Sequence, residues 1–216
     1  MTLRNYRLFV LILAAGYSLY LFKGFGDMAD AGWQFRYLTI WALTLSLFSA
    51  LALYRFSLSP GRPPFVIASL AAVLNALVVL LYWRLFFTDP TLVNGSNSPV
   101  WWREYYLHLL GPALQMADAL ILFGAFRRPR ATLVWLFTIF VAYSVWIELF
   151  VQPLNSAPVG SVTSGLPYPF LNDMQMSERL GFYATTIVTG LVFLGIGLAS
   201  EMLRKRVVAR RMGAAG

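Results

Sequence analysis

Residues 64–87 read PFVIASLAAVLNALVVLLYWRLFF, an apolar run that contains one charged side chain, Arg84. A helix rises about 1.5 Å per residue, so about 20 apolar residues cross the hydrocarbon core of a bilayer. This stretch therefore predicts a transmembrane helix.

Similar apolar stretches fill most of the remaining sequence. The chain is 59% hydrophobic and only 12% charged, whereas a soluble domain carries about a quarter charged residues. Pro, Gly, Asn and Ser collect in the short connections between the stretches. We predict an all-α polytopic membrane protein, one domain over residues 1–216, built as a bundle of six transmembrane helices. The predicted spans, good to a few residues, are 8–25, 33–56, 64–87, 101–126, 132–151 and 181–203.

Lys and Arg residues are unevenly divided between the two ends of this bundle. Twelve lie at the end of the predicted bundle that also holds the N-terminus: Arg4, Arg7, Arg55, Arg62, Arg127, Arg128, Arg130, Arg204, Lys205, Arg206, Arg210 and Arg211. Five fall at the other end: Lys23, Arg36, Arg84, Arg103 and Arg179. Cytoplasmic loops are enriched in Lys and Arg, so we predict an integral, multi-pass membrane protein with cytoplasmic N- and C-termini; if the protein is bacterial, its membrane is the inner or plasma membrane. We expect the first stretch to be a retained helix rather than a cleaved signal peptide.

The charge distribution also indicates the partner. A basic tail follows the last span and suits anionic membrane lipid, so the net charge of +8 does not predict nucleic acid binding. Aromatic side chains predict a belt at the interface opposite the termini. They are Trp33, Trp101, Trp102, Tyr105, Tyr106 and Tyr168.

The absence of cysteine excludes a thiolate metal site and a cysteine nucleophile, and His108 is the sole histidine. We predict no metal and no cofactor. Polar side chains within spans are costly in lipid and mark candidate functional positions. They are Thr39, Ser46, Asn75, His108, Gln115, Asp118, Tyr143, Glu148, Thr185, Thr186 and Thr189.

Thr39 and His108 fall at matching depths in the predicted bundle. Each lies roughly 9–10 Å of helix rise beyond an interfacial tryptophan, Trp33 or Trp101. A hydroxyl beside a neutral imidazole has the parts for nucleophilic acyl transfer. Two other readings remain open, because a membrane threonine commonly bonds its own backbone and a histidine can simply bridge helices. Thr185 and Thr186 are also at similar depth.

An acid could orient His108. Asp118 is about 15 Å further along the same helix, so a direct bond between them is excluded. We expect Asp118 to pair with Asn75, a deeper hydroxyl or a buried water. Asp118, Asn75 and Gln115 remain candidates for orienting or pocket residues. Glu148, on another span, is the better-placed third member.

Pro112 lacks an N–H and so leaves the His108 carbonyl without its helical partner. The helix should therefore open near His108, in a region that faces protein or water.

Three segments together resemble the androgen-induced-protein family of six-span membrane hydrolases. They are residues 32–39, GWQFRYLT; His108 with Pro112 and Asp118, similar to the His-x-x-x-Pro pattern of bacterial relatives; and residues 168–171, YPFL, before the final helix. The resemblance implies a threonine nucleophile and a histidine base, which fall on Thr39 and His108. The implied substrates are fatty-acid esters of hydroxy fatty acids.

We therefore predict a threonine-dependent carboxylic ester hydrolase that binds a lipid ester and releases a fatty acid product. The alternative is a non-catalytic lipid-binding or scaffold protein of the same fold. A small transporter, with Asp118 and Asn75 as its coupling pair, ranks third because matched, broken repeats are not evident.

Overall fold

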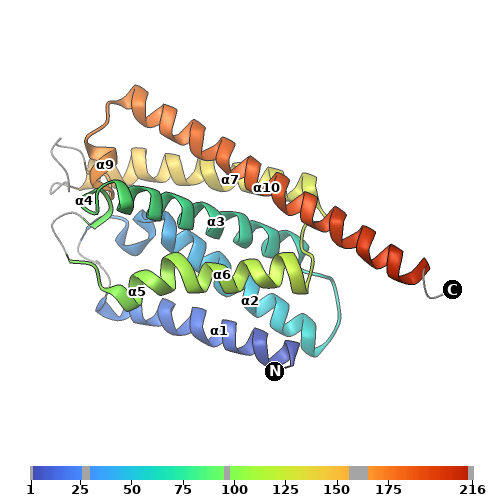
Figure 1. The fold of residues 1–216 in the computed structure, drawn as a ribbon. Coiled ribbons are helices and arrows are strands. Elements are labelled where there is room, and N and C mark those ends of the chain that lie inside the picture. The colour runs from blue at the N-terminus through green and yellow to red at the C-terminus, as the bar shows by residue number, and fades with distance from the viewer. Residues whose placement is uncertain (1, 26–29, 95–97, 156–164, 214–216) are drawn as a thin grey trace.

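A computed structural model describes residues 2–25, 30–94, 98–155 and 165–213, and every regular element within them is helical. The first half contains α1 (Leu3–Tyr20), the π-helix η1 (Leu21–Phe25), the 3-10 helix η2 (Trp33–Arg36), α2 (Leu38–Leu58), α3 (Phe65–Thr88) and α4 (Thr91–Asn94). The second half contains α5 (Trp101–Tyr105), η3 (Tyr106–Leu110), α6 (Gly111–Ala117), η4 (Asp118–Leu122), α7 (Pro129–Trp146), η5 (Ile147–Val151), α8 (Gln152–Leu154), α9 (Pro169–Asn172) and α10 (Met176–Gly213). The long helices lie side by side (Figure 1).

Five helices in the described ranges are long and apolar enough to cross a membrane. They are Leu3–Lys23, Leu38–Leu58, Phe65–Thr88, Pro129–Leu154 and Met176–Arg210. The chain is therefore a polytopic, all-helical membrane protein. The predicted fourth span is divided differently: residues 101–122 are a succession of short α and π segments, α5, η3, α6 and η4. Together they run alongside the other helices in Figure 1, and we call them the fourth pass.

Helix α3 forms the centre of the bundle. It packs against α2, α6, α7 and α10, and it is the most buried of the long apolar helices. Small side chains at Ala68, Ala71 and Ala72 allow neighbouring helices to approach closely. Large apolar side chains of the other helices face outward, as a lipid environment requires. Examples are Phe9, Ile12, Ile121, Val134, Phe137, Leu149, Val188, Val192 and Ile196.

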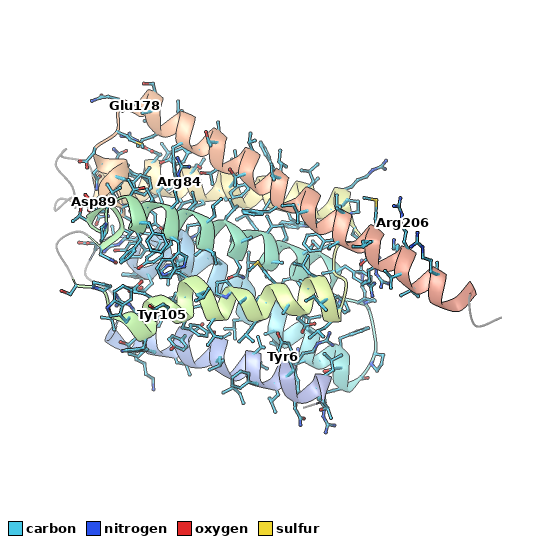
Figure 2. The ribbon with its side chains drawn as sticks, viewed as in Figure 1. Tyr6, Arg84, Asp89, Tyr105, Glu178 and Arg206 are labelled. Carbon is cyan, nitrogen blue, oxygen red and sulfur yellow. The ribbon has the colours of Figure 1, made fainter. Side chains whose placement is uncertain are left out.

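The two ends of the bundle differ. The described chain begins and ends toward one of them, which we call the terminal end, where Tyr6 and Arg206 lie (Figure 2). The other, the cavity end, carries α4, α5 and α9, with Asp89, Tyr105 and Glu178 (Figure 2). Which membrane face each end meets stays a prediction.

The aromatic belt is smaller than predicted. Trp33, Trp101, Trp102 and Tyr105 are exposed at the cavity end, as a belt requires. Tyr106 is buried, because its ring stacks on Tyr17 of α1. Tyr168 turns inward, and its hydroxyl meets the start of α2.

Several helices begin or end at residues other than the predicted span limits. The second span starts at Leu38 rather than at residue 33, because Tyr37 has an extended backbone between η2 and α2. The fourth pass ends at Leu122, where the chain turns through Gly124 with a φ of +68°. Helix α10 starts earlier and ends later than the predicted 181–203.

Candidate active site

The start of α2 determines the position of Thr39. Gly32 has a φ of +85°, and a side chain there would meet Val151 at 2.9 Å. Trp33 also has a positive φ, of +46°, a conformation that is uncommon outside glycine. One 3-10 turn and the extended Tyr37 follow, and α2 begins at Leu38. Thr39 is consequently the second residue of its helix.

The hydroxyl of Thr39 forms a different kind of hydrogen bond from the hydroxyls of the other threonines in the described spans. Thr44, Thr88, Thr132, Thr138, Thr185, Thr186 and Thr189 each donate to the carbonyl four residues earlier. For Thr39 that carbonyl belongs to Phe35, outside α2, and it accepts bonds from the indole N–H groups of Trp41 and Trp146. The Thr39 hydroxyl is therefore left for a partner on another helix.

That partner is His108. Thr39 Oγ1 and His108 Nε2 are 3.3 Å apart, and both side chains line the same cavity. The imidazole is buried, with 6% of the residue exposed, and the Tyr82 ring stacks on it with centroids 3.5 Å apart. The structure thus brings together the two residues that depth and resemblance had paired.

The fourth pass opens at His108, as Pro112 predicted. Residues Tyr106–Leu110 form a π-helical turn, and the N–H of Gly111 bonds to the carbonyl of Tyr106. The freed carbonyl of His108 accepts a 2.8 Å hydrogen bond from the indole N–H of Trp83 on α3. This bond between helices fixes the backbone that carries the imidazole.

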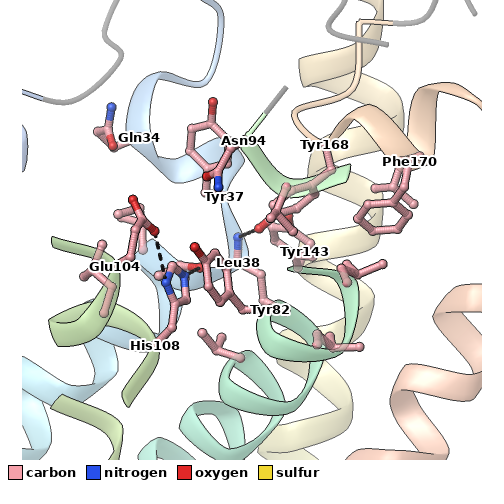
Figure 3. Close-up of a pocket in the computed structure, with 18 of the residues that line it drawn as sticks. Gln34, Tyr37, Leu38, Tyr82, Asn94, Glu104, His108, Tyr143, Tyr168 and Phe170 are labelled. Carbon is pink, nitrogen blue, oxygen red and sulfur yellow. Dashed lines mark hydrogen bonds and ion pairs between the residues drawn. The ribbon is translucent and has the colours of Figure 1, made fainter. Parts of the chain in front are cut away.

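A carboxylate lies behind the imidazole, but it is not the one that we predicted. Glu104 Oε2 is 3.2 Å from His108 Nδ1, and both side chains are buried (Figure 3). The other oxygen, Oε1, accepts bonds of 3.1 and 2.9 Å from Arg103. The contact between Nδ1 and Glu104 is within ion-pair distance without the alignment of a hydrogen bond, so Nδ1 has no hydrogen-bond partner among the described residues. Catalytic bonds are often poorly aligned before substrate binds.

The cavity has a volume of about 570 Å³. One wall is polar and contains Thr39, Glu104 and His108, whereas residues such as Leu81, Phe140 and Phe182 supply apolar surface. Most of its lining comes from α2, α3, the fourth pass, α7 and α10. Such a cavity can hold a ligand that joins a polar group to apolar chains.

The other candidate residues lie elsewhere or have other partners. Glu148 is not beside His108, because it forms bonds of 2.9 and 3.2 Å with Arg179 and accepts the Tyr183 hydroxyl. Asp118 does not pair with Asn75, because both its oxygens bond to Arg7 at 2.9 Å.

Asn75 instead donates to Ser46 and to the carbonyl of Ala71. Gln115 donates to the carbonyl of Ser46. Asn75 and Gln115 line a second hollow of only about 10 Å³. The described residues contain no cluster of three or more His, Asp or Glu side chains that could hold a metal ion.

Comparison with known protein families matches residues 5–200 to the family described as FAR-17a/AIG1-like protein. The chain belongs to this family. The match spans nearly the whole chain and confirms the resemblance found in its motifs. No curated protein and no solved structure matches the chain at a significant level.

The family motifs that carried the resemblance converge on the cavity. Residues 32–39 supply Thr39, the His-x-x-x-Pro segment supplies His108, and residues 168–171 supply Tyr168 and Phe170. Sequence reasoning missed Glu104 and Tyr82. Glu104 had a usable signal, since residues four apart face each other on a helix. Tyr82 had none, because its stacking on His108 depends on how α3 packs against the fourth pass.

Proposed function

We propose that this chain is an intramembrane lipid ester hydrolase that uses Thr39 as nucleophile and His108 as general base. The observation that carries the proposal is the 3.3 Å contact between Thr39 Oγ1 and His108 Nε2 inside a largely apolar cavity. Membership of the FAR-17a/AIG1-like family supports the reaction class. The substrates we propose, from the family resemblance, are fatty-acid esters of hydroxy fatty acids.

The reaction begins with proton transfer. A carboxylate only accepts hydrogen bonds, so Glu104 favours the tautomer of His108 that carries its proton on Nδ1. Nε2 is then free to accept the proton of Thr39 as Oγ1 attacks the ester carbonyl. The bond between the ester carbonyl carbon and the alcohol oxygen breaks, and the alcohol leaves with the proton from Nε2.

The second half of the reaction regenerates the enzyme. Thr39 now carries the acyl group, and His108 removes a proton from a water molecule that attacks the same carbonyl carbon. The bond to Oγ1 breaks, Thr39 recovers its proton from Nε2, and a free carboxylic acid leaves. Glu104 contacts Nδ1 of His108, on the side of the ring opposite Thr39, so its proposed role is to position the imidazole.

A labelling experiment on detergent-purified protein tests the proposal. A hydroxyl-reactive alkyl fluorophosphonate should label the wild type at Thr39 and abolish its hydrolysis of a fatty-acid ester of a hydroxy fatty acid. Thr39→Ala should show neither labelling nor turnover. Thr185→Ala is the matched control, because Thr185 is exposed and bonds to its own helix at Gly181.

Two outcomes would overturn the proposal. One is a Thr39→Ala variant that hydrolyses esters at the wild-type rate. The other is a wild type that binds the lipid ester but neither hydrolyses it nor reacts with the probe, which would favour the non-catalytic lipid-binding alternative.

A further inference from the structure

Tyr168 lies in the connection between α8 and α10, outside the spanning helices, yet it is held against the cavity. Asn172, fully buried, bonds through its side chain to both the N–H and the carbonyl of Leu166, at 3.0 and 2.8 Å. Phe170 and Leu171 of α9 are buried in the main core. These contacts fix the backbone on both sides of Tyr168.

The hydroxyl of Tyr168 reaches the first turn of α2. It accepts a 2.9 Å hydrogen bond from the N–H of Leu38, the residue before the proposed nucleophile (Figure 3). Its other polar neighbours are the hydroxyls of Thr39 and Tyr143. Tyr168 lines the cavity and is only partly exposed.

The Tyr168 hydroxyl is surrounded by hydrogen-bonding groups and keeps its own proton. Tyr143 donates its own proton to the carbonyl of Arg36 at 3.0 Å. Tyr168 accepts from the N–H of Leu38, and the hydroxyls of Thr39 and Tyr143 lie within its hydrogen-bonding reach. Burial raises the pKa of Tyr168 to about 12, so the hydroxyl keeps its proton at neutral pH. It is therefore a donor at the cavity wall.

Attack by Thr39 on an ester would create a negative charge on the former carbonyl oxygen, which lies next to the attacked carbon. Hydrogen-bond donors aimed at that position give the largest single contribution in many acyl-transfer enzymes. Tyr168 is on a different segment from His108 but adjacent to Thr39. The N–H of Leu38 strengthens it, because donation to its oxygen polarises the O–H bond. The amino-terminal end of α2 adds a favourable positive potential.

We infer that the Tyr168 hydroxyl is the oxyanion donor of this site, hydrogen-bonding the tetrahedral intermediate formed on Thr39. This inference rests on the proposed hydrolase function. No bond to Tyr168 forms or breaks: the proton stays on the phenol oxygen and is shared with the oxyanion only while the intermediate lasts.

The test compares Tyr168→Phe with Tyr6→Phe in purified, full-length protein. Tyr6 also has a hydroxyl that joins two segments, donating to the carbonyl of Leu114 at 2.7 Å, and it does not line the cavity. Tyr168→Phe should lower kcat by about 10²–10³-fold, with KM nearly unchanged, the effect of losing one oxyanion donor. Tyr6→Phe should leave kcat at the wild-type value.

An inhibitor separates catalysis from mere support of the fold. An alkyl trifluoromethyl ketone forms a tetrahedral oxyanion on the nucleophile, and the corresponding alkyl methyl ether does not. Tyr168→Phe should weaken ketone inhibition in proportion to kcat and leave ether inhibition unchanged, because analogues of the transition state report its stabilisation. Equal weakening of both inhibitors would overturn the inference.

A second variant covers the case in which Tyr168→Phe fails to fold. Replacement of Tyr168 by 3,5-difluorotyrosine keeps the shape and makes the phenol more acidic. Its activity should fall with rising pH as the donor proton is lost, whereas the wild type should show no such fall below about pH 10. If both enzymes have the same alkaline profile, the donor assignment is wrong.

The controls distinguish a failure of the oxyanion-donor inference from a failure of the proposed hydrolase function. A wild type without hydrolase activity, or an active Thr39→Ala variant, would refute the proposed function and the inference with it. An active wild type and an inactive Thr39→Ala variant, together with a Tyr168→Phe variant that keeps the wild-type kcat, would refute the oxyanion donor alone.

Discussion

The fourth pass holds a buried acid near each of its ends, and the two acids are bonded differently. Asp118, near the terminal end, receives two 2.9 Å bonds from Arg7, whose guanidinium also reaches the carbonyl of Leu53. Glu104, near the cavity end, divides its carboxylate between Arg103 and the imidazole of His108, whose Nδ1 lacks an aligned hydrogen bond. Only the second acid borders the large cavity.

We interpret the Asp118–Arg7 pair as structural and, on the proposed function, the Glu104–His108 pair as part of the catalytic machinery. A buried polar network that is fully satisfied makes one structure rigid. A buried titratable group that is partly satisfied and faces a cavity can respond to a ligand, and such groups concentrate at functional sites. Variants at the terminal end should therefore change stability, and variants at the cavity end should change turnover.

The largest effect should come from His108→Ala. Without the imidazole nothing accepts the Thr39 proton, so ester hydrolysis should fall by at least about 10³-fold. Unfolding temperature in detergent should change little by comparison. His108→Gln, which keeps more of the side-chain volume against Tyr82, should be equally inactive. Turnover of either purified variant near the wild-type rate would contradict a histidine base.

Asp118→Asn should produce the converse result. It leaves Arg7 as an unpaired buried charge, and breaking such a pair costs about 3–5 kcal/mol. Thermal unfolding should shift strongly downward, while kcat per folded molecule stays close to wild type. The double variant Arg7→Met with Asp118→Leu should recover much of the stability, because it removes both charges. A well-folded but inactive Asp118→Asn protein would contradict the purely structural role of Asp118.

Glu104→Gln should reduce kcat on the order of 10²-fold, since the amide holds the imidazole less firmly than a carboxylate does. The acid limb of the pH profile should also move to lower pH, because a negative neighbour that favours the protonated ring is gone. A purely structural role would leave that limb in place. Glu178→Gln, at an exposed position on α10, is the control.

The sequence was sufficient for the parts of this picture that depend on distance along a helix. Apolar length predicted the polytopic fold, helix rise matched the depths of Thr39 and His108, and Pro112 indicated where the fourth pass opens. These inferences need only local geometry.

The errors concern contacts between helices. The partner of Asp118 is Arg7, from a helix far away in sequence, and Glu148 bonds to Arg179 on α10. The sequence placed Arg7 and Arg179 at opposite ends of the bundle, but it did not indicate that both are buried and paired. Periodicity tells which residues share a face but not which faces meet. Glu104 is different, because its position four residues before His108 places both side chains on the same helix face and could have predicted their contact.

The smallest effect should come from Trp83→Phe, which tests how the backbone at His108 is held. The variant removes the N–H that bonds to the His108 carbonyl. An unsatisfied buried carbonyl costs about 1–3 kcal/mol, so unfolding temperature should fall, with only a modest loss of kcat. Adding Pro112→Ala restores a backbone N–H within reach of that carbonyl, because a helix pairs residues four apart. The double variant should therefore unfold at a higher temperature than Trp83→Phe alone. If Pro112→Ala does not raise the unfolding temperature of the Trp83→Phe variant, the assumption that an N–H at residue 112 can replace the indole N–H at the His108 carbonyl is wrong.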